Sequence, residues 1–411
     1  MIKLNTVIPH PTDIKDYDSF SKFEARSMHG QLPIIWDRAK GCDVWDRHGN
    51  QFLDFTSGIA VTNTGHGNDA VIRGLDHLVH KPLLHSYTFA TDARYRFLRE
   101  LIELCYPGGK AFLVSAGTEA TEVACKLMIM HGQKTNPNKR VLLSFKGAMH
   151  GRTMLAENLK GITGDNLWAF NFDPPNRALE WEEDFTKIFE KLENVCGIII
   201  ESYQGWSAKF FNSSYIQKLV AWAKEHDILV CFDEIQGGFG RTGKLFAYEH
   251  YSIDKPDLIC IGKGVSGSLP LSGVIGRADI LDIPEVGSMS STHSANPMSC
   301  IAGVLNLIEI RQEGLVDYAQ AQGIILQTYL REHFGWPRGQ YEINGKGLLA
   351  AILTKTTEEA TEIVWECFKR GLLTIWTHKN SVKLAPPLTI KTDELLEGLE
   401  VLNDVLLMRQ R

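Results

Sequence analysis

Apolar and polar positions along the chain form two alternating patterns. Short apolar runs, several of them rich in β-branched residues, stop at turn residues, which is typical of buried parallel strands. Between them lie longer segments with apolar residues three or four positions apart, as in amphipathic helices. We expect strands at residues 111–114, 140–145, 195–202, 228–232, 258–261 and 272–276. We expect helices at residues 69–80, at 213–227 from a Ser213 or Ser214 cap, within the segment that follows residue 115, and up to about residue 311.

The alternation of strand and helix predicts the fold class. It is the pattern of an α/β protein with a large, mostly parallel sheet flanked by helices, over residues 55–311. Beyond residue 312, charged helical segments interleave with short apolar strands. We expect residues 312–411 to join residues 1–54 in a smaller α+β domain. The N-terminal part contains a predicted hairpin with its turn at residues 48–50, followed by a glycine-rich loop at 56–68.

Composition narrows the classes of function. Of 411 residues, 44% are apolar and 22% charged, as in ordinary globular proteins, and the net charge of −6 argues against a nucleic-acid partner. No run of 18 apolar residues predicts a membrane span, and the N-terminus lacks the apolar core of a signal peptide. The eight cysteines form no CxxC pair and lie mostly in apolar runs. They predict buried, reduced thiols in a cytoplasmic protein.

Two predicted strands end in side chains that suit one chemistry. The strand at 228–232 stops at Asp233, and the strand at 258–261 stops at Gly262 and Lys263. Ligands of parallel sheets bind beyond the carboxyl ends of the strands, so the acid and the lysine could share a crevice. Pyridoxal phosphate (PLP) needs a lysine amine for a Schiff base with its aldehyde and an acid against its pyridine nitrogen. A lone lysine is usually a solvated charge, but the flanking glycines and the apolar strand argue against that here.

A phosphate site is predicted where a strand passes into a helix. Gly117 and Thr118 stand immediately before a helix that begins at Glu119. First-turn N–H groups and the helix dipole favour an anion there, and glycine permits its close approach. The alternative is that Thr118 is a plain N-cap and that Glu119 and Glu122 are ordinary first-turn acids.

Other classes of site are less consistent with the residues. The run GFGRTG at 238–243 matches the dinucleotide pattern GxGxxG, but its glycines do not form the strand–helix turn, and Asp257 precedes its strand instead of ending it. His77 and His80 share a helical face with His85 beyond, yet no third ligand follows at a recognisable spacing, so we predict no metal. No GxSxG motif supports a serine hydrolase.

Four stretches together resemble one enzyme family. They are TSGIAVTNTGHGN, FDEIQGGFGRTG, IGKG and KLAPPLTI, and the similarity spans nearly the whole chain. The chain is similar to the class III PLP-dependent aminotransferases of fold type I, among them ornithine, acetylornithine and 4-aminobutyrate aminotransferases. That group also contains glutamate-1-semialdehyde aminomutase and some amino-acid epimerases. The most specific feature is the acid of FDEIQGGFGRTG followed 30 residues later by the lysine of IGKG.

The resemblance implies roles for the residues around the cofactor. It makes Lys263 the Schiff-base lysine and later the proton shuttle, and Asp233 the partner of the pyridine nitrogen. It implies that Gln236 lies near the phenolic oxygen of PLP, and that Gly117 and Thr118 bind its phosphate.

The resemblance also implies a second subunit and substrate contacts. Thr292 matches a threonine that reaches the phosphate from the other subunit, so a homodimer is expected. Glu201, in ESYQG, matches a glutamate that lies near the substrate amine. Arg152, in HGRT, matches an arginine that holds a distal carboxylate in glutamate-using members.

Three positions depart from the family pattern. Ala116 stands where a serine usually precedes the glycine of the phosphate loop. Met149 stands where an aromatic residue usually stacks on the cofactor ring, and His150 beside it is a second candidate for that contact. Lys383 stands where the family often has an arginine, which alters the clamp for the substrate α-carboxylate. The alternative for Lys383 is an exposed strand residue.

The activity implied by the resemblance is ping-pong transamination between an amino donor and a 2-oxo acid or aldehyde. Lys263 would move the proton between the substrate Cα and the cofactor. An aminomutase or epimerase of the same fold would use the same Lys263 and Asp233 without a separate carbonyl acceptor. A non-catalytic binding module is a third reading, and an intact lysine–acid pair argues against it. The substrate stays open among ω-amines, unusual amino acids and amino sugars.

Overall fold

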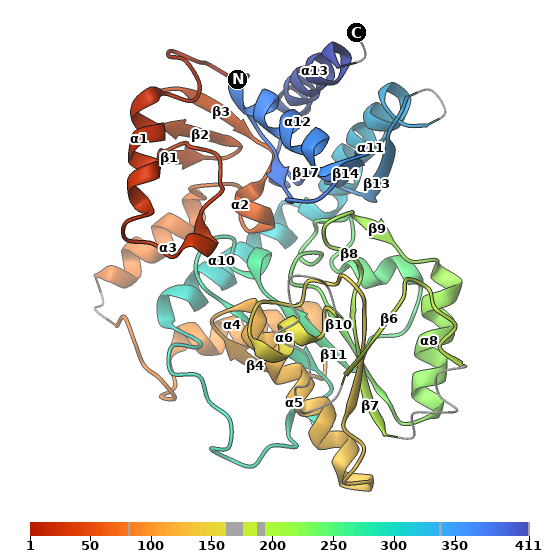
Figure 1. The fold of residues 1–411 in the computed structure, drawn as a ribbon. Helices are drawn as coiled ribbons and strands as arrows, with labels where there is room; N and C mark the ends of the chain where they lie inside the picture. The colour runs from red at the N-terminus through yellow and green to blue at the C-terminus, as the bar shows by residue number, and fades with distance from the viewer. Residues whose placement is uncertain (81–82, 162–175, 187–193, 337–338, 410–411) are drawn as a thin grey trace. The chain divides into compact units, whose positions relative to one another are not determined.

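Two compact units make up the chain. The structure is a computed structural model that describes residues 1–80, 83–161, 176–186, 194–336 and 339–409 (Figure 1). The smaller unit contains Met1–Asn68, Trp206–Ala208 and Asp317–Arg411, and the larger unit contains Asp69–Gly205 and Lys209–Val316. The domain boundaries expected near residues 55 and 312 stay a prediction.

A seven-stranded sheet forms the centre of the larger unit (Figure 1). Its strands in spatial order are β4 (Lys110–Val114), β12 (Ser272–Gly276), β11 (Leu258–Ile261), β10 (Leu229–Asp233), β7 (Val195–Glu201), β5 (Val141–Phe145) and β6 (Asn176–Leu179). The strands from β11 to β6 run parallel, whereas β12 is antiparallel to both of its neighbours. The predicted α/β class with a mostly parallel sheet is therefore confirmed. Strand β6 was not expected from the sequence.

The larger unit also contains helices. They are α3 (Asp69–Val79), α4 (Asp92–Cys105), α5 (Gly117–Thr135), α6 (Met154–Asn158), α8 (Ser213–Glu225), α9 (Ala278–Leu281) and α10 (Pro297–Gln312). Of these, α5, α8 and α9 pack against this sheet. The predicted cap of α8 was wrong by one or two residues, because the side chain of Asn212 accepts the hydrogen bond from Ser214 N. A short antiparallel pair, β8 (Tyr203–Gln204) and β9 (Lys209–Phe210), follows β7.

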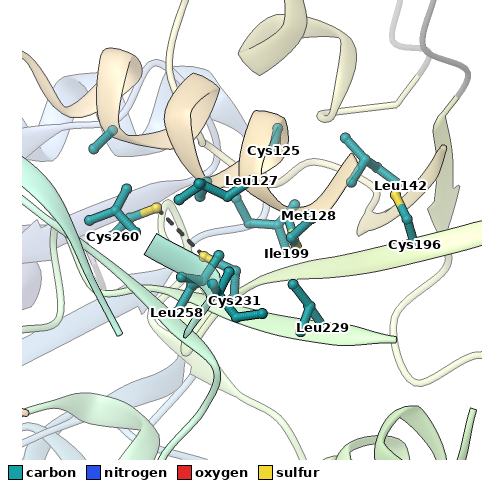
Figure 2. Close-up of a cluster of buried hydrophobic side chains, with 14 of the residues drawn as sticks. Cys125, Leu127, Met128, Leu142, Cys196, Ile199, Leu229, Cys231, Leu258 and Cys260 are labelled. Atoms are coloured by element: carbon teal, nitrogen blue, oxygen red, sulfur yellow. Dashed lines mark hydrogen bonds between the residues drawn. The ribbon is translucent and has the colours of Figure 1, made fainter. Parts of the chain in front are cut away.

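The core between α5 and the sheet contains several thiols (Figure 2). It includes the side chains of Cys125, Cys196, Cys231 and Cys260, and the Sγ atoms of Cys231 and Cys260 lie 3.6 Å apart. Gly197 lets α5 approach β7 closely, since a Cβ there would lie 2.3 Å from the Met128 sulfur. All eight cysteines are buried and unbridged, which confirms the prediction of buried free thiols.

The smaller unit joins the two ends of the chain in one sheet. Its first sheet has the order β1 (Trp36–Lys40), β2 (Asp43–Asp46), β3 (Gln51–Asp54) and β15 (Leu372–Leu373). The pairing of β2 with β3 confirms the predicted hairpin, and β15 lies parallel to β3. The second sheet has the order β13 (Glu342–Lys346), β14 (Leu349–Leu353), β17 (Ser381–Leu384) and β16 (Ile375–Trp376).

The remaining helices belong wholly or mostly to this unit. They are α1 (Pro11–Phe20), α2 (Ser57–Ala60), α11 (Leu315–His333), α12 (Thr357–Lys369) and α13 (Thr392–Met408). The short α2 interrupts the loop expected at residues 56–68, and left-handed φ angles at Gly58 and Ile59 kink it. Across the described ranges, every helix is too short or too polar to cross a lipid bilayer.

Candidate active site

The carboxyl end of β10 carries a buried acid. Asp233 is 6% exposed and lies in register with Glu201 on β7 and with Cys260 on β11. Its Oδ2 lies 2.8 Å from Nδ1 of His150, and its Oδ1 accepts a hydrogen bond of 3.1 Å from Ile235 N. The acid that the strand pattern picked out is thus oriented by an imidazole that the sequence places 83 residues away.

His150 is buried behind this acid. Burial alone would lower its pKa, but the hydrogen bond and charge of Asp233, with a contribution from Glu201, leave the pKa raised above that of free imidazole. The backbone carbonyl of His150 accepts a hydrogen bond of 2.8 Å from Thr121 Oγ1, which ties it to α5. Within the described ranges, Nε2 is buried without a hydrogen-bond partner. The imidazole of His150 therefore orients the side chain of Asp233.

Lys263 begins a short turn directly after β11. It opens the 3-10 helix η4 (Lys263–Val265) and has a φ of +43°, in the left-handed region that favours glycine. Such a conformation costs a non-glycine residue about 1–3 kcal/mol, which the surrounding structure has to supply. Burial lowers the pKa of the Lys263 amine, and the charges of Asp233 and Glu201 oppose that shift. A lowered pKa increases the fraction of neutral, nucleophilic amine.

Glu201 ends β7 beside Asp233. Burial, together with the charge of Asp233, raises the pKa of Glu201, although the charge of His150 opposes the shift. Its Oε2 accepts a hydrogen bond of 3.1 Å from Met149 N. Gly205 makes room for the carboxylate, because a Cβ there would lie 2.5 Å from Oε1. Three of the predicted site residues, Asp233, Glu201 and Met149, therefore meet at one edge of the sheet.

The start of α5 is capped by Glu119. Ala116 is the N-cap residue, and Oε2 of Glu119 accepts hydrogen bonds from Ser115 N at 2.9 Å and Ala116 N at 2.8 Å. The reading of Thr118 as a plain N-cap was therefore wrong. The Thr118 hydroxyl instead bonds the Thr153 hydroxyl at 2.7 Å. The first N–H groups of an α-helix have no partner within the helix, so Gly117 and Thr118 retain the donors that an anion needs.

Ile235 is a site residue that the sequence reading missed. A Cβ at Gly117 would lie 3.1 Å from the Ile235 side chain, and a Cβ at Gly262 would lie 3.2 Å from it. Ile235 therefore packs between the start of α5 and the turn that carries Lys263. Its position two residues after Asp233 was the available signal, but residues 235–240 form turns, so no strand period predicted the direction of its side chain.

The other predicted residues of this unit differ in their surroundings. Gln236 Oε1 accepts a hydrogen bond of 3.2 Å from the Tyr203 hydroxyl, and burial raises the pKa of that tyrosine well above its ordinary value. Met149 is 43% exposed. Arg152 and Thr292 have exposed side chains.

Lys383 belongs to the smaller unit. It lies in β17, paired with Ala351 on β14 and Ile375 on β16, and is 3% exposed. The alternative of an exposed strand residue was therefore wrong. A lysine side chain is rarely buried without a counter-charge or hydrogen-bond partners, so the buried position of Lys383 requires such partners.

The competing site classes find no support in the geometry. Residues 238–243 form turns and lead into a 3-10 helix, η3 (Ala247–Tyr251), where a dinucleotide site would open an α-helix. Within the part of the chain that the structure describes, no three His, Cys, Asp or Glu side chains gather as metal ligands would.

The residues fit one class of cofactor. An amine with a lowered pKa at Lys263, a buried acid at Asp233 and the first-turn N–H groups of Gly117 and Thr118 suit the aldehyde, the pyridine nitrogen and the phosphate of PLP. Together with the sheet, they define an α/β enzyme of the PLP-dependent class.

Comparison with known proteins gives the family. The profile of the family described as Aminotransferase class-III matches residues 25–406. The ornithine aminotransferase of Saccharomyces cerevisiae is 33% identical over 405 residues, covering 93% of this chain and 95% of that protein. The acetylornithine aminotransferase of Caldanaerobacter subterraneus subsp. tengcongensis is 30% identical over 397 residues, covering 94% and 98%.

Solved structures agree with this assignment. A structure of the ornithine aminotransferase from Toxoplasma gondii, with PLP at partial occupancy in its active site, superposes with a TM-score of 0.85. It is 25% identical and covers 96% of this chain and 94% of that chain. The chain belongs to the class III aminotransferases, PLP-dependent enzymes that move an amino group from a donor to a carbonyl acceptor. The resemblance and the fold type stated from the sequence are confirmed.

Proposed function

We propose that Lys263, Asp233 and His150 are the catalytic centre of this aminotransferase. The observation that carries the proposal is the Asp233–His150 pair at 2.8 Å beside a lysine whose pKa is lowered. When bound, PLP withdraws electrons from the substrate Cα and so makes its proton acidic. The Lys263 amine would hold the cofactor through its aldehyde and, once freed, would carry the proton at the substrate Cα. Its lowered pKa leaves more of the amine in the neutral form that accepts this proton.

Asp233 and His150 act together in this proposal. The His150 imidazole, with its raised pKa, keeps a positive charge beside Asp233 to a higher pH than free imidazole would. The paired Asp233 carboxylate would hold the pyridine nitrogen of the cofactor and keep it protonated. Both groups are buried, and fixed charges act more strongly away from water.

The remaining cofactor contacts follow from the positions around this centre. We assign the phosphate to the N–H groups of Gly117 and Thr118, and the phenolic oxygen to Gln236. Met149, which is partly exposed next to His150, is assigned to a face of the cofactor ring.

We further propose that the enzyme is a homodimer in which Thr292 reaches the phosphate in the partner subunit. Exposed apolar side chains concentrate in one stretch of the larger unit, including Ile72, Val79, Leu83, Leu84, Tyr87, Phe89 and Tyr95. Asn296 Nδ2 donates a hydrogen bond of 2.6 Å to Leu84 O, so this stretch adjoins the segment that contains Thr292. Exposed apolar surface of this kind is typical of protein interfaces.

Complementation between variants tests the dimer. A mixture of Lys263→Ala and Thr292→Ala protomers, unfolded and refolded together, contains heterodimers with one site that keeps both side chains. We expect turnover well above that of either variant alone. Turnover no greater than the sum of the two variants, in a sample shown to be mixed, would contradict a role for Thr292 in the partner's site.

For the substrates we propose an ω-amino donor that carries a carboxylate, and a 2-oxo acid with a second carboxylate. The support is that two relatives are named for ornithine and acetylornithine, together with three candidate contacts. Glu201 is assigned to the substrate amine, Arg152 to a distal carboxylate and Lys383 to the α-carboxylate. A lysine offers a point charge where an arginine would grip a carboxylate with two hydrogen bonds, so donors with a weakly held α-carboxylate are favoured.

The experiment that tests the function is an absorption titration of the PLP-loaded protein. With a suitable ω-amino donor and no acceptor, the band of the lysine-bound cofactor should be replaced by that of pyridoxamine phosphate, and 2-oxoglutarate should restore it. Lys263→Ala should lower turnover at least about a thousandfold. The exposed Lys110, paired with Asp282 at the start of β4, provides the control Lys110→Ala, which should leave turnover unchanged. A band that no donor converts, with exchange of substrate Cα protons, would refute transamination.

A further inference from the structure

The turn that carries Lys263 is held in an unfavourable shape. Val265 N donates a hydrogen bond of 3.0 Å to Gly262 O, so Lys263 is the second residue of a four-residue turn. Its φ of +43° belongs to a position where turns usually have glycine or asparagine. The chemistry of the site requires a lysine there, so contacts outside the turn have to maintain its shape.

Asn306 makes such contacts from α10. Its Nδ2 donates hydrogen bonds to Gly264 O at 2.8 Å and to Val265 O at 3.2 Å. The side chain is fully buried, and the other buried residues near it on the helix are apolar or small, among them Ala302, Gly303, Leu307 and Ile310. Asparagine is a poor helix former, and a buried amide is costly unless its hydrogen bonds are satisfied. The two carbonyls of the Lys263 turn account for its presence there.

Helix α10 is a rigid support for this contact. Asn296 caps its first turn by accepting a hydrogen bond of 2.9 Å from Met298 N. Gly303 brings it close to α4, since a Cβ there would lie 2.7 Å from the Phe97 ring. Arg311 forms an ion pair of 2.5 Å with Glu100 of α4 near the other end of α10. A side chain on this helix therefore holds the turn at a fixed point relative to the core.

We propose that Asn306 is a positioning residue for the Lys263 amine. By binding two successive carbonyls, it keeps the turn in the strained conformation that places the amine beside Asp233 and Glu201. Without its amide, the turn relaxes toward a conformation that a lysine prefers, and Nζ moves away from the point of proton transfer. The proposal rests on the proposed role of Lys263.

Variants of Asn306 test the proposal against a matched control. Asn306→Leu removes both donors at similar volume, and Asn306→Ser keeps one smaller donor. At the opposite end of β11, the Tyr106 hydroxyl donates a hydrogen bond of 2.9 Å to Pro256 O, so Tyr106→Phe also deprives a buried carbonyl of its donor. All variants should lower Tm, but a positioning role predicts further changes only at Asn306.

Three measurements distinguish a positioning role of Asn306 from a role in stability alone. In the PLP-loaded protein, we expect Asn306→Leu to lower kcat about tenfold or more, since misplacement by an ångström is costly, with KM within about threefold. The pH midpoint of the bound cofactor's absorption should shift. In PLP-free protein, the pH dependence of Lys263 acetylation by acetic anhydride, followed by mass spectrometry, should report a pKa closer to that of free lysine than in wild type. Asn306→Ser should fall between wild type and Asn306→Leu.

The outcomes are distinguishable. If Asn306→Leu lowers Tm as Tyr106→Phe does, yet kcat and both pH midpoints match wild type, Asn306 is only a structural residue and the proposal is overturned. If Asn306→Leu does not fold, the same comparison is made with Asn306→Ser. If Lys263→Ala retains wild-type turnover, the proposed function fails instead, whatever Asn306 does.

Discussion

Two adjacent acids at the end of β10, Asp233 and Glu234, have different hydrogen-bond partners. Asp233 and Glu234 are both buried, and successive side chains at a strand end point to opposite faces. On one side, Asp233 meets the imidazole of His150. On the other side, Glu234 accepts hydrogen bonds from the Ser202 hydroxyl, from Ala247 N at 2.9 Å and from Tyr248 N at 2.7 Å.

On the two sides of this strand end, the raised pKa belongs to different groups: Glu234 itself on one side, and the partner of Asp233 on the other. Burial raises the pKa of Glu234 to about 7 despite its three neutral donors. Its hydrogen bonds hold η3 against the sheet, which is a structural role. Asp233 has the imidazole of His150 as its partner, and that contact raises the pKa of His150. Asp233 and Glu234, neighbours in one motif, thus have different partners.

The largest expected effect is the loss of kcat on substitution of Asp233. Asp233→Asn keeps the shape but removes the negative charge, and we expect kcat to fall roughly 10²- to 10³-fold because the pyridine nitrogen is no longer held protonated. Steady-state kinetics at saturating PLP measures this. The control is Asp279→Asn, which removes an exposed acid paired with Arg277. A kcat within a few-fold of wild type at full PLP occupancy would remove the catalytic role from Asp233.

The second-largest effect on kcat should come from substitution of His150, the partner of Asp233. His150→Gln leaves Asp233 without a cation, and we expect kcat to fall roughly ten- to a hundredfold, as for other residues that orient a functional group. The pKa of His150 lies above that of free imidazole. As pH rises through that raised pKa, His150 loses its proton and Asp233 loses the charge beside it, so activity should fall. The wild-type pH profile should therefore have an alkaline decline that the Gln variant lacks. Superimposable profiles would contradict the pairing.

Substitution of Glu234 should change the free energy of unfolding. Its pKa of about 7 exceeds the ordinary 4.5, so the folded state binds a proton that the unfolded state does not. This contribution is complete below the unfolded pKa and is lost as pH rises through 7. The free energy of unfolding of Glu234→Gln relative to wild type should therefore change by roughly 2 kcal/mol between pH 5.5 and pH 8, the deficit being larger at the lower pH. Urea denaturation at both pH values measures it, with the exposed Glu180→Gln as control. A deficit independent of pH would show that Glu234 stays ionised.

The smallest effect should come from the middle of β10. Cys231 lies two residues before Asp233 but faces the apolar core (Figure 2). Burial raises the pKa of its neighbour Cys125 well above the ordinary value, and the hydrogen bond with Cys231, together with burial, does the same for Cys260. We expect Cys231→Ala to cost about 1 kcal/mol of stability and to leave kcat within about twofold. Maleimide should label the native protein negligibly and the urea-unfolded protein fully. Rapid labelling of the native protein, located to this cluster by mass spectrometry, would show that the core opens.

Much of the site was predictable because its signals are local. An apolar run that stops at Asp233 and another that stops at Lys263 follow from the burial of parallel strands, and the carboxyl ends of such strands meet at one edge. The start of α5 was predicted to within two residues, since the helix expected from Glu119 begins at Gly117.

Contacts between distant segments were not predictable in this way. The sequence pointed to His150 as a candidate for the cofactor ring, whereas its imidazole binds Asp233. Strand β12 reads as one more apolar run, and only its pairing shows that it is antiparallel. Lys383 reads equally well as an exposed residue, but the strands on either side of β17 bury it.

The sequence by itself determined the α/β class, the family, the lysine and the acid, because apolar period, turn residues and motif spacing are properties of neighbouring residues. Only the tertiary structure decided which of the two adjacent acids receives an imidazole partner, which asparagine bonds the Lys263 turn and which hydrophobic residue packs beside the start of α5. Those choices depend on short distances between side chains far apart along the chain. Hydrogen bonds and charges act over a few ångströms, and packing of the core brings the partners within that range.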